Sequence, residues 1–243
     1  MIGKKYASQV LALAQTAVDD QYDQICVVAN KIFESTKNGG LLHVFGCGHS
    51  HMMMEEVFYR AGGFVPINPI FETSTMLHEG AIKSSLIERM TGYAPLVLDN
   101  YNVNKGEVIL VFSTSGINSF PIEMAIAAKE KGLTTVGFTS LSYSDVESRH
   151  PTGEKLYDVV DFVINNHAPY GDAMVDYERS GIKAVPSSTI LSMTLLNTLI
   201  AEVLNCYDQA GLTPPAFISG NTKDGLERNQ EHFDNFKFRV KAL

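Results

Sequence analysis

The sequence predicts an α/β fold in which helices cover both faces of a mostly parallel sheet. Two observations lead to this prediction. Short apolar runs that suit buried strands alternate along the chain with longer runs whose apolar residues recur at helical spacing. Two of the short runs are each followed by a turn rich in glycine and hydroxyl residues that opens a helix. Strands that alternate with helices imply right-handed crossovers between parallel strands.

The first elements can be placed from apolar spacing and turn residues. Apolar residues recur every three or four positions from Tyr6 to Ile32, which predicts a long helix that ends at the glycines near residue 39. A strand at 41–45 and a helix at 49–60, stopped by Gly62-Gly63, follow. A short strand at 64–67 contains Pro66, which favours an edge position because proline cannot donate a hydrogen bond to a neighbouring strand.

The later elements continue the alternation. The segment 71–104 is expected to hold one helix at 81–90 and a second, shorter helix before the turn at 104–106. Further expected elements are a strand at 108–112, a helix at 120–131, strands at 134–138 and 161–164, and a long helix over the apolar run 190–207. We expect a single domain over residues 1–243, with the N-terminal helix (1–38) used for packing or oligomerisation and a C-terminal tail at 211–243.

Composition narrows the class of protein. The net charge is −8 and no segment is dense in Lys or Arg, so neither nucleic acid nor an anionic membrane is an expected partner. The three cysteines are widely spaced and form no CxxC pair, which favours reduced thiols in a cytoplasm over a disulfide framework. No stretch suits a bilayer span or a secretory leader. We therefore expect a cytoplasmic protein.

Three clusters of hydroxyl residues indicate an anion site. Gly46-Cys47-Gly48-His49-Ser50 and Ser113-Thr114-Ser115-Gly116 each follow a strand, and Ser187-Ser188-Thr189 precedes the last long helix. Glycine lets the backbone approach a ligand closely, and the first N–H groups of a helix point towards negative charge. Ligands of parallel sheets bind at the carboxyl ends of the strands, where the first two clusters lie. The clusters together predict a site for a phosphorylated small molecule.

These turns, with the strand at 134–139, resemble those of the sugar isomerase (SIS) domain, a family with a flavodoxin-like three-layer α/β/α sandwich that binds phosphosugars. The resemblance implies that phosphate is held by Ser50, Ser113, Thr114, Ser115 and, by its offset, Asn118, where the family often has threonine. A closer similarity covers nearly the whole chain and is to a subgroup of phosphosugar-binding proteins related to phosphoheptose isomerases. It includes Gly48-His49-Ser50-His51, 55–63, 148–151 and 171–173.

Further residues are candidates for sugar or phosphate contact. Gly48 belongs to the first turn, and Ser187, Ser188 and Thr189 form the third cluster. Asp172 follows a strand end in a turn, where it is expected to hold either a sugar hydroxyl or only the turn itself.

Aldose–ketose isomerisation needs a base that moves a proton between C1 and C2, and carboxylates and imidazoles are the usual groups. The candidates are His49 inside the first turn, His51 and Glu55 four residues apart on one helix face, and the neighbours His78 and Glu79. For His49 the favoured interpretation is a residue that only lines the site, and His51 with Glu55 is equally interpretable as a structural pair. Although these side chains offer nitrogen and oxygen ligands, their spacing is not that of a closed zinc site, so no metal and no cofactor are expected.

Three functions remain open from the sequence. The favoured one is a phosphosugar isomerase similar to phosphoheptose isomerase. The alternatives are a non-catalytic phosphosugar sensor and a lyase or etherase that acts on an amino-sugar phosphate. A phosphorylated sugar is the expected partner in all three, and the fold class favours a homodimer or homotetramer.

Overall fold

A five-stranded parallel sheet forms the centre of the molecule, in a computed structural model that describes all 243 residues. The strands are β1 (Leu42–Gly46), β2 (Ile67–Pro69), β3 (Val108–Phe112), β4 (Thr134–Thr139) and β5 (Phe162–Asn165). Their order in the sheet is β2-β1-β3-β4-β5, which is the flavodoxin-like order, and every pairing is parallel. The predicted fold class is confirmed.

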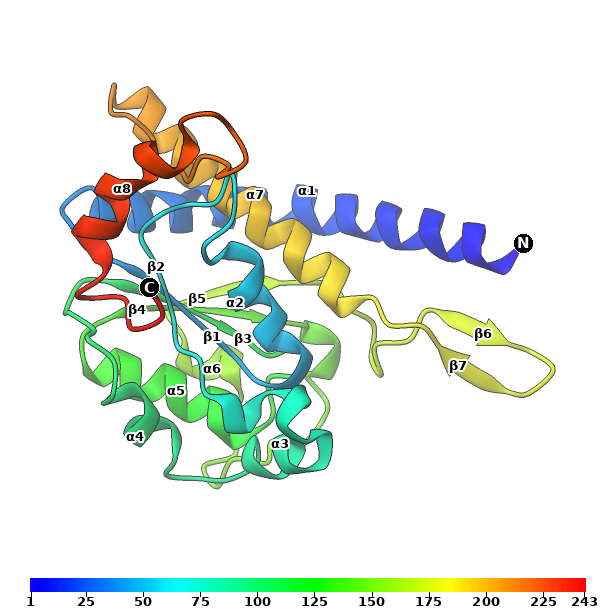
Figure 1. Cartoon of the computed structure of the whole chain (residues 1–243). Helices are drawn as coiled ribbons and strands as arrows, with labels where there is room; N and C mark the ends of the chain where they lie inside the picture. The colour runs from blue at the N-terminus through cyan, green and yellow to red at the C-terminus, as the bar shows by residue number, and fades with distance from the viewer.

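Helices cover both faces of this sheet (Figure 1). They are α1 (Ile2–Thr36), α2 (Met52–Val57), α3 (Ala81–Ile87), α4 (Ala94–Leu98), α5 (Ser119–Glu130), α6 (Leu156–Val159), α7 (Ser188–Gln209) and α8 (Gly225–Phe236). A two-stranded antiparallel hairpin, β6 (Val175–Tyr177) and β7 (Ile182–Ala184), projects from the sheet body beside the first turns of α1.

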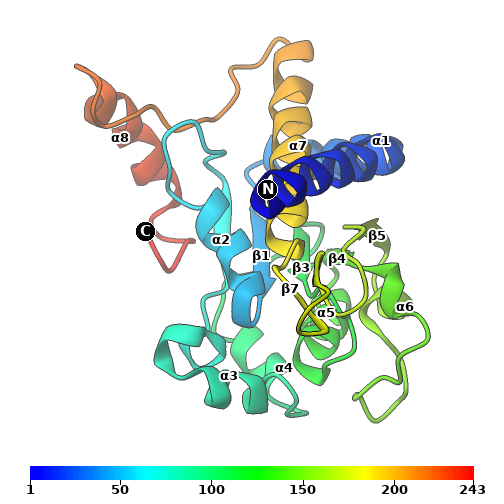
Figure 2. The same ribbon diagram turned by 90° about the vertical axis from the view of Figure 1, so that its right-hand side faces the viewer.

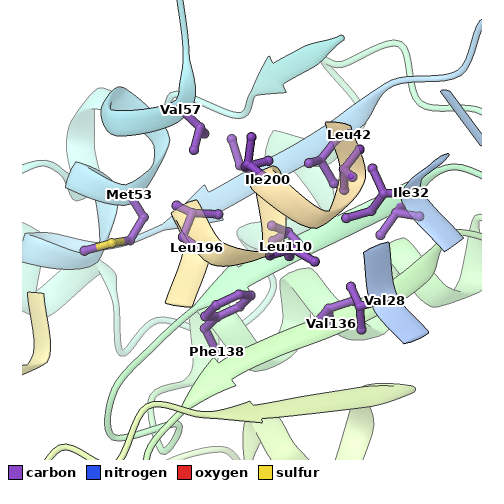
Figure 3. Close-up of a cluster of buried hydrophobic side chains, with 14 of the residues drawn as sticks. Val28, Ile32, Leu42, Met53, Val57, Leu110, Val136, Phe138, Leu196 and Ile200 are labelled. Atoms are coloured by element: carbon purple, nitrogen blue, oxygen red, sulfur yellow. The ribbon is translucent and has the colours of Figure 1, made fainter. Parts of the chain in front are cut away.

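One face of the sheet packs against α1, α2 and α7. Figure 3 shows Val28 and Ile32 from α1 and Leu196 and Ile200 from α7 around Leu110 of β3. The other face carries a second core, in which α4, α5 and α6 cover the sheet. Helix α7 is long and apolar enough to cross a membrane by composition, but its apolar side chains form the centre of the first core, which accounts for that composition.

A buried polar network closes the amino ends of β1 and β3. The carboxylate of Glu107, only 3% exposed, accepts hydrogen bonds from the backbone N–H groups of Leu41 and Asn104. It also accepts from the His43 ring at 2.8 Å and from Arg239 at 2.7 Å. Burial by itself would raise the pKa of Glu107, but the hydrogen bonds from His43, the Asn104 amide and Arg239 lower it to about 2. Arg239 thereby fastens the C-terminal tail to the sheet.

Two predicted elements are wrong in their bounds. The helix expected at 49–60 is a 3₁₀ turn, Gly48–His51, followed by α2, and it ends at Val57 because Phe58 is extended and Tyr59 is left-handed. Gly62-Gly63 therefore does not stop it. The strand expected at 64–67 lies at 67–69, because the backbone of 62–65 bonds instead to residues 215–217 of the tail. The edge position of this strand is confirmed.

Candidate functional site

The three hydroxyl clusters meet in one cavity at the carboxyl ends of β1 and β3. These two strands are neighbours at the point where the strand order reverses, which is where ligands bind in sheets of this kind. The cavity is lined by His49, Ser50, Met53, Phe112, Ser113, Thr114, Phe138, Ser188, Thr189 and Ser192. Figure 2 shows β1, β3 and the start of α7, and most of the wall comes from the turns that follow the two strands and from α7. The cavity volume is about 20 Å³, enough for about one water molecule.

Two glycines make the turns around the cavity possible. A Cβ atom on Gly46 would lie 2.6 Å from the Ser50 carbonyl oxygen, so a side chain there would push the first turn open. Gly116 is left-handed, with φ of 64°, and a Cβ atom on it would lie 2.7 Å from Oγ1 of Thr139. Both positions need glycine, because the turns fold back tightly at the strand ends.

Most hydroxyl groups of the cavity wall have hydrogens that no protein atom accepts. Ser113 accepts a bond from the Gly116 N–H, and Thr114 and Ser192 accept bonds from the Asn166 amide, but none of the three donates one. Ser113 and Ser192 are only 4% and 5% exposed, so water does not easily satisfy them. A phosphate dianion can only accept hydrogen bonds, and a wall of unused donors therefore suits it.

Sequence reasoning missed Ser192 and Asn166. Ser192 lies one helical turn after Ser188 on the same face of α7, so the i, i+4 spacing could have found it. Asn166 is fully buried and comes directly after β5, at the same edge of the sheet as the other clusters. Its amide joins Thr114 to Ser192, which fixes the second and third clusters relative to each other.

Asp172 lies against the third cluster and not in the cavity wall. Its Oδ1 accepts bonds from the Ser187 and Ser188 N–H groups and from the Ser187 hydroxyl, at 2.9, 2.7 and 3.0 Å. Its Oδ2 accepts from the Ser188 hydroxyl at 2.6 Å. The carboxylate therefore occupies the N-terminus of α7, where negative charge is favourable.

The remaining predicted contacts lie outside the wall. Gly48 and Ser115 flank it in the turns, without lining the cavity. Asn118 accepts a bond from Arg149 at 2.6 Å and bonds to the Glu88 carboxyl. Burial raises the pKa of Glu88, against the lowering effect of Asn118 and two arginines. The Asn118 amide is thus committed to the loop beside α5.

Of the acid/base candidates, His49 lines the cavity and the other four do not. His49 is exposed, lines the cavity and makes no hydrogen bond, so it is the imidazole that a bound ligand meets first. His51 is buried, with Nδ1 2.6 Å from the Gly48 carbonyl oxygen and Nε2 3.2 Å from Oε1 of Glu55. Because a carbonyl only accepts, Nδ1 carries a hydrogen, and the contact with Glu55 then requires one further proton between the two groups.

His78 and Glu79 are neighbours in the chain, but their side chains contact different groups. The His78 ring centre lies 5.9 Å from that of His51, so His78 joins the His51–Glu55 pair. Glu79 lies just before α3 and contacts Lys83 in the first turn of that helix. Hydrogen bonds from Thr73 and Lys83 lower the pKa of Glu79. An exposed carboxylate with a lowered pKa is the least suited of the five to give up a proton.

Cys47 and possible metal ligands complete the inventory of reactive groups. Burial raises the pKa of the Cys47 thiol well above its usual value, which makes it a poor nucleophile despite its place before a helix. No group of three or more His, Cys, Asp or Glu side chains is close enough to hold a metal ion.

Comparison with known proteins gives the class and then the family. A family model of the SIS domain matches residues 5–140, so this is a SIS-domain protein. The chain is 40% identical over 240 residues to the UPF0309 protein of Geobacillus thermodenitrificans, covering 98% of this chain and 96% of that protein. It is 41% identical to the UPF0309 protein of Halalkalibacterium halodurans, with the same coverage. The chain belongs to the UPF0309 family of SIS-domain proteins.

Solved structures agree on the fold. The phosphoheptose isomerase of Francisella tularensis superposes with a TM-score of 0.55 at 13% identity, over 85% of this chain and 96% of that one. The phosphoheptose isomerase of Neisseria gonorrhoeae has a TM-score of 0.53 at 15% identity, over 86% of this chain and 100% of that one. At such identities the likeness concerns the arrangement of helices and strands.

Proposed function

We propose that this protein binds the phosphate of a phosphorylated sugar in the hydroxyl cavity and interconverts the aldose and ketose forms of that sugar. The observation that carries the proposal is the meeting of three hydroxyl clusters, with unused buried donors, at the strand-order reversal. The fold shared with two phosphoheptose isomerases supports it. The cavity must widen to admit phosphate, since its present volume suits one water molecule.

Hydroxyl and backbone donors can hold phosphate without a basic side chain. The cavity wall contains no Lys or Arg, and the net charge of the chain is −8. Attraction must therefore come from donors at short range, namely Ser50, Ser113, Thr114 and Thr189. Gly48 and Ser115 flank the cavity in the two turns, and Asn118 follows the second turn. Ser188 lines the wall on the side of α7, with Ser187 and Asp172 next to it.

Anchoring the phosphate places the sugar carbons outside the cavity mouth, beside His49. A proton moves from C2 to C1 through an enediolate, which needs one group to take the carbon proton and another to exchange protons with the two oxygens. We assign the first role to His49, because it lines the cavity and has no protein partner. The proton held between His51 and Glu55, with His78 beside them, serves the oxygens.

The binding half of the proposal is tested by calorimetry. Sugar phosphates, each paired with its unphosphorylated parent, are titrated into the protein and into Ser113→Ala. We expect only the phosphorylated member of a pair to bind, and Ser113→Ala to weaken it about tenfold, since one charge-assisted hydrogen bond is lost. Ser85→Ala, an exposed hydroxyl on α3 with no hydrogen bond, is the matched control. Equal binding of both members of every pair would contradict the phosphate site.

The catalytic half is tested by NMR in D₂O with any sugar phosphate that binds. We expect loss of the C2 proton signal and growth of the isomer. His49→Asn and Glu55→Gln should keep the affinity within about threefold and slow exchange by about 10²-fold or more. Binding without exchange would leave the sensor function, and cleavage of an ether bond with release of the alcohol fragment would indicate the lyase.

We also propose that a second copy covers the projecting half of α1. Leu11 is 65% exposed there, and the first turns of α1 extend beyond the sheet body (Figure 1). Ile2, Tyr22 and Val27 are also exposed along α1, and several exposed apolar side chains on one helix favour association. Light scattering should report a dimer or tetramer for the protein and a smaller species for Leu11→Glu. A monomer at high concentration would contradict the proposal.

A further inference from the structure

The carboxylate of Asp172 and the phosphate expected in the cavity need the same donor. Ser188 is the one hydroxyl of the cavity wall that already donates to a protein acceptor, Oδ2 of Asp172, at 2.6 Å. Its hydroxyl carries a single hydrogen, which cannot serve two anions at once. In contrast, the hydrogens of Ser113 and Ser192, both more than nine-tenths buried on the same wall, have no protein acceptor.

The negative charges of phosphate and Asp172 add repulsion to this competition. A dianion in the cavity would lie beside Ser188 and therefore close to the Asp172 carboxylate that Ser188 contacts. Two negative groups sharing one helix N-terminus repel each other, and the wall has no Lys or Arg to screen them. The cavity holds about one water molecule, so the wall that includes Ser188 must move for phosphate to enter. Phosphate entry and the Asp172 contact therefore oppose each other.

The Asp172 contact also holds the segment that carries the hairpin. Asp172 precedes β6, and Val185 follows β7, with Pro186 between it and the third cluster. Both are left-handed, with φ of 48° and 68°, a conformation rare for a β-branched residue such as Val185. Four hydrogen bonds to Ser187 and Ser188 tie the two ends of this segment together. If these bonds were released, residues 172–185 would lose their polar attachment to α7, while Ala168 and Gly171 would keep their bonds to Ser140, Ser142 and Tyr143.

We propose that Asp172 is an internal competitor for the phosphate site: its carboxylate holds Ser188 and the N-terminus of α7 until a ligand phosphate displaces it and releases the hairpin segment 172–185. This inference depends on the phosphate site proposed above. It makes Asp172 a residue that determines specificity, because a neutral sugar hydroxyl cannot displace a carboxylate from these donors, whereas a dianion can.

Inorganic phosphate is the probe for the test, titrated by calorimetry in a phosphate-free buffer. Asp172→Asn keeps the shape of the side chain and removes its charge, so phosphate should bind at least about tenfold more tightly than to the unchanged protein. Asp176→Asn makes the same charge change at an exposed hairpin position without a hydrogen bond, and it should leave the affinity unchanged. Ser187→Ala, outside the cavity wall, removes one bond to Asp172 and should also strengthen binding, which keeps the test valid if Asp172→Asn folds poorly.

Hydrogen exchange supplies a second readout that a purely structural cap would not change. Saturating phosphate should speed amide exchange in residues 172–185 of the unchanged protein and leave β3 unchanged, and Asp172→Asn should show the fast exchange without phosphate. Equal or weaker phosphate binding by both Asp172→Asn and Ser187→Ala, with Ser113→Ala still defective, would overturn the competition and leave the phosphate site intact. Absence of phosphate and sugar phosphate binding in every variant would overturn the phosphate site, and the competition with it.

Discussion

Replacing Glu107 by Gln tests whether the buried network at the amino ends of β1 and β3 stabilises the fold through charge. Each carboxylate oxygen of Glu107 accepts two hydrogen bonds, and Gln must present an NH₂ group to one such pair of donors. The pKa of Glu107 falls from 4.5 to about 2 on folding. A difference of this size corresponds to roughly 3 kcal/mol of stability at pH 7, and Glu107→Gln should lose about that amount.

The dependence on pH follows from the direction of the shift. Because the folded pKa lies below the unfolded one, the contribution is complete well above pH 4.5 and disappears as the pH falls towards 2. By pH 3 about 2 kcal/mol of it should be gone. The gap between the unchanged protein and Glu107→Gln should narrow accordingly.

Urea unfolding followed by far-UV circular dichroism measures this gap, since the chain has no tryptophan. Protein concentration is held constant so that association does not alter the midpoint. Glu130→Gln, an exposed carboxyl at the end of α5, is the control and should change stability by less than about 0.5 kcal/mol. A gap below about 1 kcal/mol at pH 7, or one that does not change between pH 7 and 3, would refute the reasoning.

Three further outcomes follow from single positions. Gly116→Ala should lose about 1–3 kcal/mol by urea unfolding, because its left-handed φ and the nearby Thr139 leave no room for a Cβ; unchanged stability would show that the turn can relax. Leu195→Ala, fully buried under α1, should lose about 2–5 kcal/mol in the same assay, and a loss below 1 kcal/mol would contradict its place in the core. A thiol reagent followed by mass spectrometry should modify the half-buried Cys26 and Cys206 first and Cys47 only on unfolding; early labelling of Cys47 would contradict its burial.

Local sequence patterns correctly predicted the elements whose structure depends on residues nearby in the chain. The run 108–112 was predicted as a strand and is β3, since five consecutive apolar residues between turns suit a strand buried on both faces. The hydroxyl turns after β1 and β3 could be placed at one edge for the same reason. Gly62-Gly63, by contrast, was wrongly predicted to end a helix, because its backbone bonds to the tail about 150 residues later.

In the candidate site too, the residues within local motifs were predicted and those joined by tertiary contacts were missed. Ser50, Ser113, Thr114, Ser188 and Thr189 were predicted and line one cavity, whereas Ser192 and Asn166 were missed. The hairpin at 175–184 was also missed, because its short strands pair only with each other and bury little apolar surface. The sequence likewise did not reveal that Asp172 bonds to Ser187 and Ser188.

By itself the sequence determined the α/β class, the alternation of helices and strands and the three hydroxyl clusters, because apolar period, glycine turns and helix starts are local properties of the chain. Only the tertiary structure decided which hydroxyl hydrogens remain unused, which carboxylate occupies the N-terminus of α7, and how Glu107 is held by His43 and Arg239. Hydrogen-bond partners far apart in sequence are chosen by the packing of the whole chain, and a donor has one hydrogen to give whichever acceptor the fold brings to it.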